Sequence, residues 1–157
     1  MDVDVNIYGT DMGGGLYGAQ DAHSNFTIGD EVITTIDDNA KTMTTRVNGE
    51  IVSSSPVSLG KASTPTPNGT YYLGDRHESL IMDSSTFGVP VDSADGYRLS
   101  VNWATQMSYS GIYVHGAPWS VGQQGFTNVS NGCINVTDAY AKSFQNNSNR
   151  GDVVEVI

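Results

Sequence analysis

The chain has 157 residues, which is enough for one domain with a real core but not comfortably for two. Its 17 acidic and seven basic residues give a formal net charge of −10, which argues against nucleic acid, whose phosphates must be neutralised by Lys and Arg. Abundant glycine (18 residues), 38% hydrophobic residues and the lack of any apolar run near the roughly 20 residues of a membrane helix indicate a folded, turn-rich, mainly β protein.

The N-terminal half predicts short strands separated by turns. Val3, Val5 and Ile7 alternate with polar residues, which is the period of a strand. A glycine-rich loop follows over 13–18. Further strands are predicted over 31–36, 42–47 and 50–54. Asn48-Gly49 joins the last two, because this dipeptide is a strong signal for a two-residue hairpin turn.

The C-terminal half predicts further strands and one helix. Prolines and glycine make 63–69 a loop, and 84–96 is expected to be a long irregular loop of the kind that often forms lids or binding elements. Thr137 can cap a helix over 138–146 through its hydroxyl, and Asp138 suits the positive end of the helix dipole. The predicted strands are 70–73, 80–82, 98–101, 112–114 and 152–157.

Cys133 is the only cysteine, so it can form neither an internal disulfide nor a Cys-based zinc site. A thiol becomes a nucleophile when a base takes its proton, and an imidazole is the usual base. Gly132 precedes Cys133 and Gly116 follows His115, which would let backbone N–H donors approach closely, as acyl transfer requires. Composition alone leaves open both a catalytic pair and a small buried hydrophobic cysteine.

Fourteen residues, 116–129, separate His115 from the run Ser130-Asn131-Gly132-Cys133-Ile134-Asn135. This pattern resembles the signature of the L,D-transpeptidase catalytic domain (YkuD-type fold) of mycobacterial or actinobacterial type, in which a His is followed, after about 14 to 17 residues, by Ser/Thr-His-Gly-Cys, a hydrophobic residue and Asn. The resemblance covers most of the chain. It extends to 47–49, 63–66, 82–86, 88–90, 96–97, 103–106, 117–120 and 150–152.

The resemblance implies that Cys133 attacks the peptide bond between the L-centre of meso-diaminopimelate and the terminal D-Ala of a tetrapeptide stem. An acyl-thioester forms, and the side-chain amine of a second diaminopimelate displaces the enzyme to leave a 3→3 cross-link. His115 accepts the thiol proton, the backbone carbonyl of Gly116 orients it, and N–H groups around Gly132 and Cys133 form the oxyanion hole. The family often has serine at the position of Gly116. We expect that loss to be mild, because the carbonyl remains.

Asn131 stands where the family usually has histidine. The change is neutral if that side chain only donates hydrogen bonds, since an amide still donates, but it impairs catalysis if the position must titrate or share a proton. The remaining residues that the resemblance assigns to substrate binding are Ser130, Asn135, Tyr97, Trp119 and Met82, with packing as the alternative for the last three.

The implied fold is mainly β, a β-sandwich-like domain of two mixed sheets with one helix after the catalytic strand. Residues 1–29 resemble the end of a preceding immunoglobulin-like domain or a linker, and 30–157 would be the catalytic domain. The family implies an extracytoplasmic location, in the periplasmic or cell-wall space. We expect the chain to be part of a longer secreted or membrane-anchored protein.

The implied partners are peptidoglycan stem peptides, as donor and as acceptor, and carbapenem β-lactams as covalent inhibitors. No cofactor, metal or nucleic acid is expected, His23 and His77 are expected on the solvated surface, and a monomer is expected. Two alternatives remain open: an L,D-carboxypeptidase, in which water replaces the acceptor amine, and a catalytically impaired peptidoglycan-binding domain, motivated by Asn131. A papain-like protease is disfavoured because its Cys precedes its His.

Overall fold

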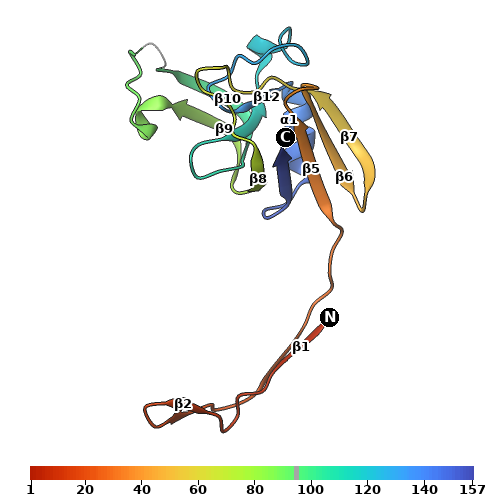
Figure 1. The fold of residues 1–157 in the computed structure, drawn as a ribbon, viewed down its shortest axis with the longest axis vertical. Coiled ribbons are helices and arrows are strands. Elements are labelled where there is room, and N and C mark those ends of the chain that lie inside the picture. Colours follow the sequence, from red (N-terminus) through yellow and green to blue (C-terminus); the bar gives the residue numbers. More distant parts are fainter. Residues whose placement is uncertain (94–95) are drawn as a thin grey trace. The chain divides into compact units, whose positions relative to one another are not determined.

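The structure is a computed structural model that describes residues 1–93 and 96–157, and it divides into two units, Met1–Asp30 and Glu31–Ile157 (Figure 1). The first unit consists of two small antiparallel pairs. In one, β1 (Asp2–Val5) pairs with β4 (Ala22–Asn25), and in the other, β2 (Asp11–Gly13) pairs with β3 (Leu16–Tyr17). The predicted strand near the N-terminus is present, although it ends at Val5. The assignment of residues 1–29 to an immunoglobulin-like domain stays a prediction.

A five-stranded mixed sheet forms one layer of the second unit, in the order β7-β6-β5-β13-β8. The hairpin predicted at Asn48-Gly49 joins its strands β6 and β7. The sheet is mixed because β13 runs parallel to β5 and antiparallel to β8. Its strands are β5 (Val32–Asp37), β6 (Thr42–Val47), β7 (Glu50–Pro56), β8 (Gly69–Tyr72) and β13 (Val153–Val156).

A four-stranded mixed sheet carries the residues of chemical interest, in the order β12-β11-β10-β9. The strands are β9 (Arg76–Asp83), β10 (Arg98–Gln106), β11 (Tyr113–Gly116) and β12 (Ile134–Val136). β11 and β12 are parallel, whereas the other pairs are antiparallel. The register of β10 against β11 shifts between Asn102 and Thr105, and Trp103 there has a φ of 55°. Such an irregularity bends a strand and redirects its side chains.

The helix α1 (Asp138–Asn147) follows β12 and packs against β10 and β11. Thr137 caps it as predicted, because its side chain accepts a hydrogen bond from the Tyr140 backbone N–H at 3.2 Å. The main core joins both sheets and this helix. Its buried members are Ile36, Met43, Val57, Leu59, Leu73, Met107, Ile112, Val114, Ile134, Val136, Ala141, Phe144, Val154 and Val156.

The predicted class, mainly β with two mixed sheets and one helix after the catalytic strand, is confirmed. β9 and β10 are longer than predicted, and His77, which was expected on the solvated surface, lies within β9, half-buried and with its ring centroid 6.4 Å from that of Tyr113. The predicted irregular loop begins with the 3₁₀ helix η1 (Ser84–Phe87), and its residues 94–95 lie outside the described residues. Among the residues described, no helix is long and apolar enough to span a membrane.

Candidate active site

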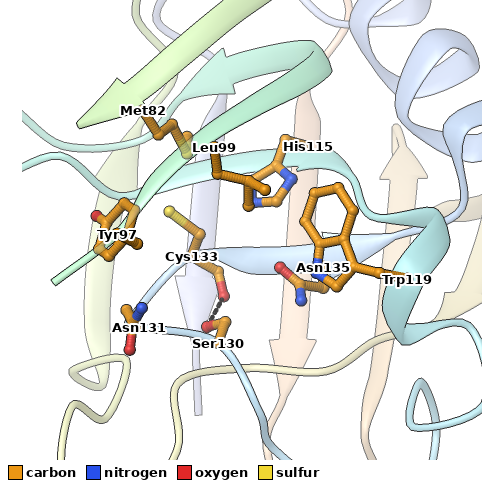
Figure 2. A pocket seen from close by; sticks show the side chains of 9 residues that line it. All are labelled: Met82, Tyr97, Leu99, His115, Trp119, Ser130, Asn131, Cys133 and Asn135. Carbon is orange, nitrogen blue, oxygen red and sulfur yellow. Dashed lines mark hydrogen bonds between the residues drawn. The ribbon is translucent and has the colours of Figure 1, made fainter. Parts of the chain in front are cut away.

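A pocket beside the four-stranded sheet gathers nine side chains (Figure 2). Eight of them were predicted from the sequence, and the ninth, Leu99 on β10, was missed. Leu99 could have been predicted from its place two positions after Tyr97, because residues two apart lie on one face of an extended chain. The lining residues are Met82, Tyr97, Leu99, His115, Trp119, Ser130, Asn131, Cys133 and Asn135.

His115 lies on β11, between β10 and β12, and is only 3% exposed. Its Nδ1 lies 2.9 Å from the backbone oxygen of Gly116. A carbonyl can only accept, so Nδ1 carries the proton and Nε2 is left free to act as a base. Burial lowers the pKa of His115, while the hydrogen bond to Gly116 and the charge of Asp138 act to raise it. The imidazole is therefore neutral near pH 7, as a base must be.

Cys133 precedes β12 and is 7% exposed. Burial raises the pKa of its thiol to about 11, against a backbone hydrogen bond from Tyr113 that lowers it. The thiol also lies 3.6 Å from the carbonyl oxygen of Gly111, to which it donates. In the view of Figure 2 the sulfur lies between the rings of Tyr97 and His115. A neutral thiol and a neutral imidazole in one pocket suit proton removal during attack rather than a standing thiolate.

A network of short polar contacts fixes the turn that presents Cys133. The Ser130 hydroxyl donates to the Cys133 carbonyl at 2.6 Å and accepts from the Gly132 N–H at 3.0 Å (Figure 2). The Thr66 hydroxyl donates to the Gly132 carbonyl at 2.9 Å and accepts from the Gly60 N–H at 3.0 Å. Gly132 has a φ of 114°, which side chains rarely tolerate, so the motif's glycine is required by the turn itself.

Asn135 supports the pocket from beneath. It is 3% exposed, it pairs with His115 across β11 and β12, and its amide donates to the Ser120 hydroxyl at 3.1 Å. Ser120 in turn donates to the Ala117 carbonyl at 3.3 Å. The asparagine at the end of the signature therefore ties β12 to the 3₁₀ helix η2 (Pro118–Ser120). Its predicted direct contact with substrate stays a prediction.

Tyr97 is held in place by Ser84. Its N–H donates to the Ser84 hydroxyl at 2.9 Å, and its carbonyl accepts from the Ser84 N–H at 3.0 Å. Burial raises the pKa of Tyr97, and the charges of Cys133 and Asp83 add to this. Met82 is buried and packs in the same small cluster as Cys133, which makes it both a pocket and a packing residue.

Asn131 and Trp119 lie at the exposed rim of the pocket. Trp119 is 50% exposed, and its ring centroid lies 6.1 Å from that of His115. Asn131 is exposed and lines both this pocket and a neighbouring one, which Ser84 and Val89 also line. Among the hydrogen bonds of the described residues, none joins Asn131 to His115 or Cys133. The substitution therefore changes the surface that a ligand meets, and leaves the buried pair in place.

Neither of the other two histidines is among the residues that line this pocket. His23 is exposed in the first unit, and its Nδ1 lies 2.6 Å from an Asp4 carboxylate oxygen. His77 lies on β9, as described above. Within residues 1–93 and 96–157, no group of three His, Cys, Asp or Glu side chains is arranged to hold a metal ion.

A buried thiol beside a carbonyl-anchored imidazole, on a β-rich scaffold, is typical of cysteine-dependent acyl-transfer domains. Residues 31–156 match the family model described as YkuD, the L,D-transpeptidase catalytic domain. The chain therefore belongs to the L,D-transpeptidase catalytic-domain family, as its residue pattern predicted.

Individual relatives agree with this assignment. The chain is 59% identical over its whole length to "L,D-transpeptidase 2" of Mycobacterium tuberculosis, of which it spans 38%. It is similar to the solved structure of the L,D-transpeptidase LdtMt1 in complex with imipenem, with a TM-score of 0.82 and 40% identity over 90% of this chain and 64% of that one. For L,D-transpeptidase 3 of M. tuberculosis with a faropenem-derived adduct, the TM-score is 0.78 and the identity 35%, over 89% and 65% of the two chains.

Proposed function

We propose that this domain catalyses peptidoglycan L,D-transpeptidation through an acyl-enzyme on Cys133. The observation that carries the proposal is the pairing, in one pocket, of the buried Cys133 thiol with a His115 imidazole whose tautomer is fixed by the Gly116 carbonyl. Membership of the L,D-transpeptidase family supports the choice of a stem peptide as acyl donor. Because the chain spans 38% of the relative it matches at 59% identity, the activity of the whole protein is part of the proposal.

Acylation begins when Nε2 of His115 takes the thiol proton while Sγ of Cys133 attacks the carbonyl carbon of the L-centre of diaminopimelate. The S–C bond forms, and the carbonyl electron pair moves onto oxygen. The intermediate then collapses, the C–N bond to D-Ala breaks, and the imidazolium returns its proton to the leaving amine. An acyl-thioester and free D-Ala remain, with His115 neutral again.

Transfer follows the same path in reverse. The side-chain amine of a second diaminopimelate attacks the thioester carbon, and His115 accepts the proton that this amine loses. The C–S bond then breaks, the thiolate of Cys133 recovers the proton from the imidazolium, and the 3→3 cross-link is released. The raised pKa of the thiol favours this final proton return.

The oxyanion formed in both steps needs N–H donors. The Gly132 N–H is engaged with the Ser130 hydroxyl at 3.0 Å, so we assign the first oxyanion contact to the Cys133 N–H. We assign the holding of the donor stem to Tyr97 and Met82, which lie near the thiol, and to Trp119, which lies beside His115 (Figure 2). Asn131, at the rim, would contact the donor or acceptor without touching the proton path.

The proposed substrate places the activity outside the cytoplasmic membrane, where peptidoglycan lies. Carbapenems are the proposed covalent inhibitors, since a strained β-lactam carbonyl offers Cys133 the same electrophile as the donor stem. The imipenem complex and the faropenem-derived adduct of the two structural relatives support this choice.

The decisive experiment is incubation of the protein with imipenem, followed by intact-mass measurement, with Cys133→Ala and His115→Gln as variants. We expect a mass gain of one drug in the wild type, none in Cys133→Ala, and slow gain in His115→Gln. A folded wild-type protein that gains no mass would overturn the proposal, and an unchanged rate in His115→Gln would remove His115 as the base.

Product analysis separates the proposal from its alternatives. With a disaccharide-tetrapeptide alone, we expect release of D-Ala together with a cross-linked dimer. Release of D-Ala with tripeptide as the only product would instead indicate an L,D-carboxypeptidase. Saturable binding of the stem without D-Ala release would indicate a peptidoglycan-binding domain impaired by Asn131.

A further inference from the structure

Asp138 approaches His115 from a part of the chain that the proposed mechanism does not use. β12 ends at Val136, which pairs with Gly116 of β11, and the chain enters α1 two residues later at Asp138. A Cβ added to Gly116 would lie 2.0 Å from Oδ1 of Asp138. The carboxylate therefore fills the space that a side chain after His115 would occupy, and only glycine leaves room for it.

The two oxygens of Asp138 have different surroundings. Oδ2 accepts from the Asn102 side-chain amide at 3.3 Å, and Asn102 pairs with Gly116 from the other side, on β10. Oδ1 is buried and, among the described residues, has no hydrogen-bond partner. Asn102 thus holds the carboxylate by one oxygen and leaves the other against the Gly116 backbone.

Two backbone amides close in sequence to Gly116 and Asp138 are already engaged. The Ala117 N–H donates to the Val136 carbonyl at 2.8 Å, and the Tyr140 N–H donates to the Thr137 hydroxyl at 3.2 Å. A buried carboxylate oxygen without a partner costs free energy, so its retention calls for a compensating interaction. The dipole at the start of α1 supplies part of it. The other neighbouring group whose charge Asp138 affects is His115, whose Nδ1 bonds the carbonyl of the same Gly116.

We propose that Asp138 is a positioning residue for acyl transfer: its carboxylate, seated over Gly116, stabilises the imidazolium that His115 forms when it takes the thiol proton. The inference rests on the proposed function. A carboxylate behind a catalytic imidazole acts in this way in other acyl-transfer enzymes. Here it acts through space, because Nδ1 of His115 bonds the Gly116 carbonyl and not the carboxylate.

The charge environment of His115 supports this role. The ionisable groups that face it are the Cys133 thiol before β12, the Tyr97 phenol across the pocket and the Asp138 carboxylate on α1. Trp119 on η2 and Leu99 on β10 add no charge. Asp138 is the charge that raises the pKa of His115 against the effect of burial. Removing it therefore leaves a weaker base that stays neutral to lower pH.

The test uses Asp138→Asn, which keeps the shape and removes the charge, and Asp138→Ser as a second neutral variant that still suits a helix start. Glu155→Gln is the matched control, because it removes one exposed negative charge on β13 of the other sheet. For each protein, the second-order rate of imipenem acylation is measured from pH 4 to 9, and the imidazole of His115 is titrated by NMR.

In both Asp138 variants we expect two linked changes. The acid limb of the rate profile and the NMR titration of His115 move to lower pH, while the plateau rate falls on the order of tenfold, since a nearby charge changes imidazolium stability by about that factor in a buried site. Glu155→Gln leaves both unchanged. A lower plateau with an unmoved acid limb, or no change at all, would overturn the proposal.

Gly116→Ala adds an independent check, because its Cβ would displace the carboxylate. We expect it to slow acylation as Asp138→Asn does, and to add nothing further in an Asp138→Ser background. Equal losses in both backgrounds would contradict the proposal. If the wild type is not acylated at all, the proposed function fails, and the NMR titration still decides whether Asp138 controls the charge of His115.

Discussion

The burial of Cys133 has a measurable thermodynamic consequence at alkaline pH. In the folded protein burial raises the pKa of the thiol to about 11, from an ordinary value of 9.0. As pH rises above about 9, the unfolded chain loses its thiol proton while the folded chain keeps it. The free energy of unfolding must therefore fall with pH across this window, and the loss reaches roughly 2–3 kcal/mol as pH approaches and passes 11.

The measurement is urea unfolding of the wild type and of Cys133→Ser at pH 7, 9, 10 and 11. Serine does not titrate in this range, so the difference between the two proteins isolates the thiol, while the tyrosines and lysines contribute to both. We expect a constant difference up to about pH 9 and a relative loss of about 2–3 kcal/mol in the wild type by pH 11.

The opposite result has a clear meaning. If Cys133 and His115 formed a standing thiolate–imidazolium pair, the thiol pKa would lie below its ordinary value in the folded state. The thiol would then cause no loss of stability in the wild type relative to Cys133→Ser between pH 9 and 11. A difference that stays constant across this range would refute the neutral resting thiol, and with it the need for His115 to remove the proton during attack.

Three further predictions concern the turn and the rim of the pocket. Gly132→Ala places a side chain at a φ of 114° and should lower stability by about 1–3 kcal/mol in urea unfolding and slow imipenem acylation. Thr66→Val removes both hydrogen bonds of that hydroxyl and leaves the Gly132 carbonyl unpaired, which should cost about 1–3 kcal/mol; an unchanged unfolding midpoint would contradict this. Asn131→His should keep the acylation rate within about threefold, because Asn131 lies at the exposed rim; a gain of a hundredfold would show that the missing histidine matters.

Local signals were sufficient for part of the fold. The hairpin at Asn48-Gly49 and the helix cap at Thr137 each depend on only a few neighbouring residues. Both the hairpin and the helix start are where they were predicted. β12 was not predicted as a separate strand, because its three residues show no alternation and their partner β11 lies some 20 positions earlier. β10 was predicted too short, since the positive φ at Trp103 interrupts its pattern while the strand continues to Gln106.

The candidate site was predicted by motif resemblance more than by residue pattern alone. In the signature, His115 comes first and the Ser130–Asn135 run follows after 14 residues. The fold brings His115 and residues of this run into one pocket. Thr66 and Ser120 act from other segments, which the resemblance covers at 63–66 and 117–120 without assigning these two residues a role. From the sequence, Thr66 is predicted to be part of a loop that contains prolines. In the fold, the β-bridge between Gly60 and Ser130 and the hydrogen bond from the Thr66 hydroxyl to the Gly132 carbonyl hold this part of the chain against the turn before Cys133. Ser120 was likewise part of a conspicuous segment, but its bond to Asn135 depends on the register of β12.

A change at Gly116 can be interpreted correctly only together with the residue at position 138. From the sequence, its missing side chain was expected to be a mild loss, since the carbonyl that orients His115 remains, and Asp138 was a helix-start residue that favours the positive end of a dipole. The structure shows the carbonyl bonded to His115 and Asp138 at the start of α1, while the mildness of the loss stays a prediction. In the fold, however, the place of a Cβ at Gly116 is taken by Oδ1 of Asp138, so glycine and aspartate occupy one space between β11 and α1. A chain with a side chain at position 116 must put that carboxylate elsewhere, and its histidine would then rely on the backbone carbonyl alone. On the proposed role of Asp138, glycine at 116 and aspartate at 138 together stabilise the imidazolium of His115. A variant at either position should therefore be judged by how it changes the position or the charge of this carboxylate.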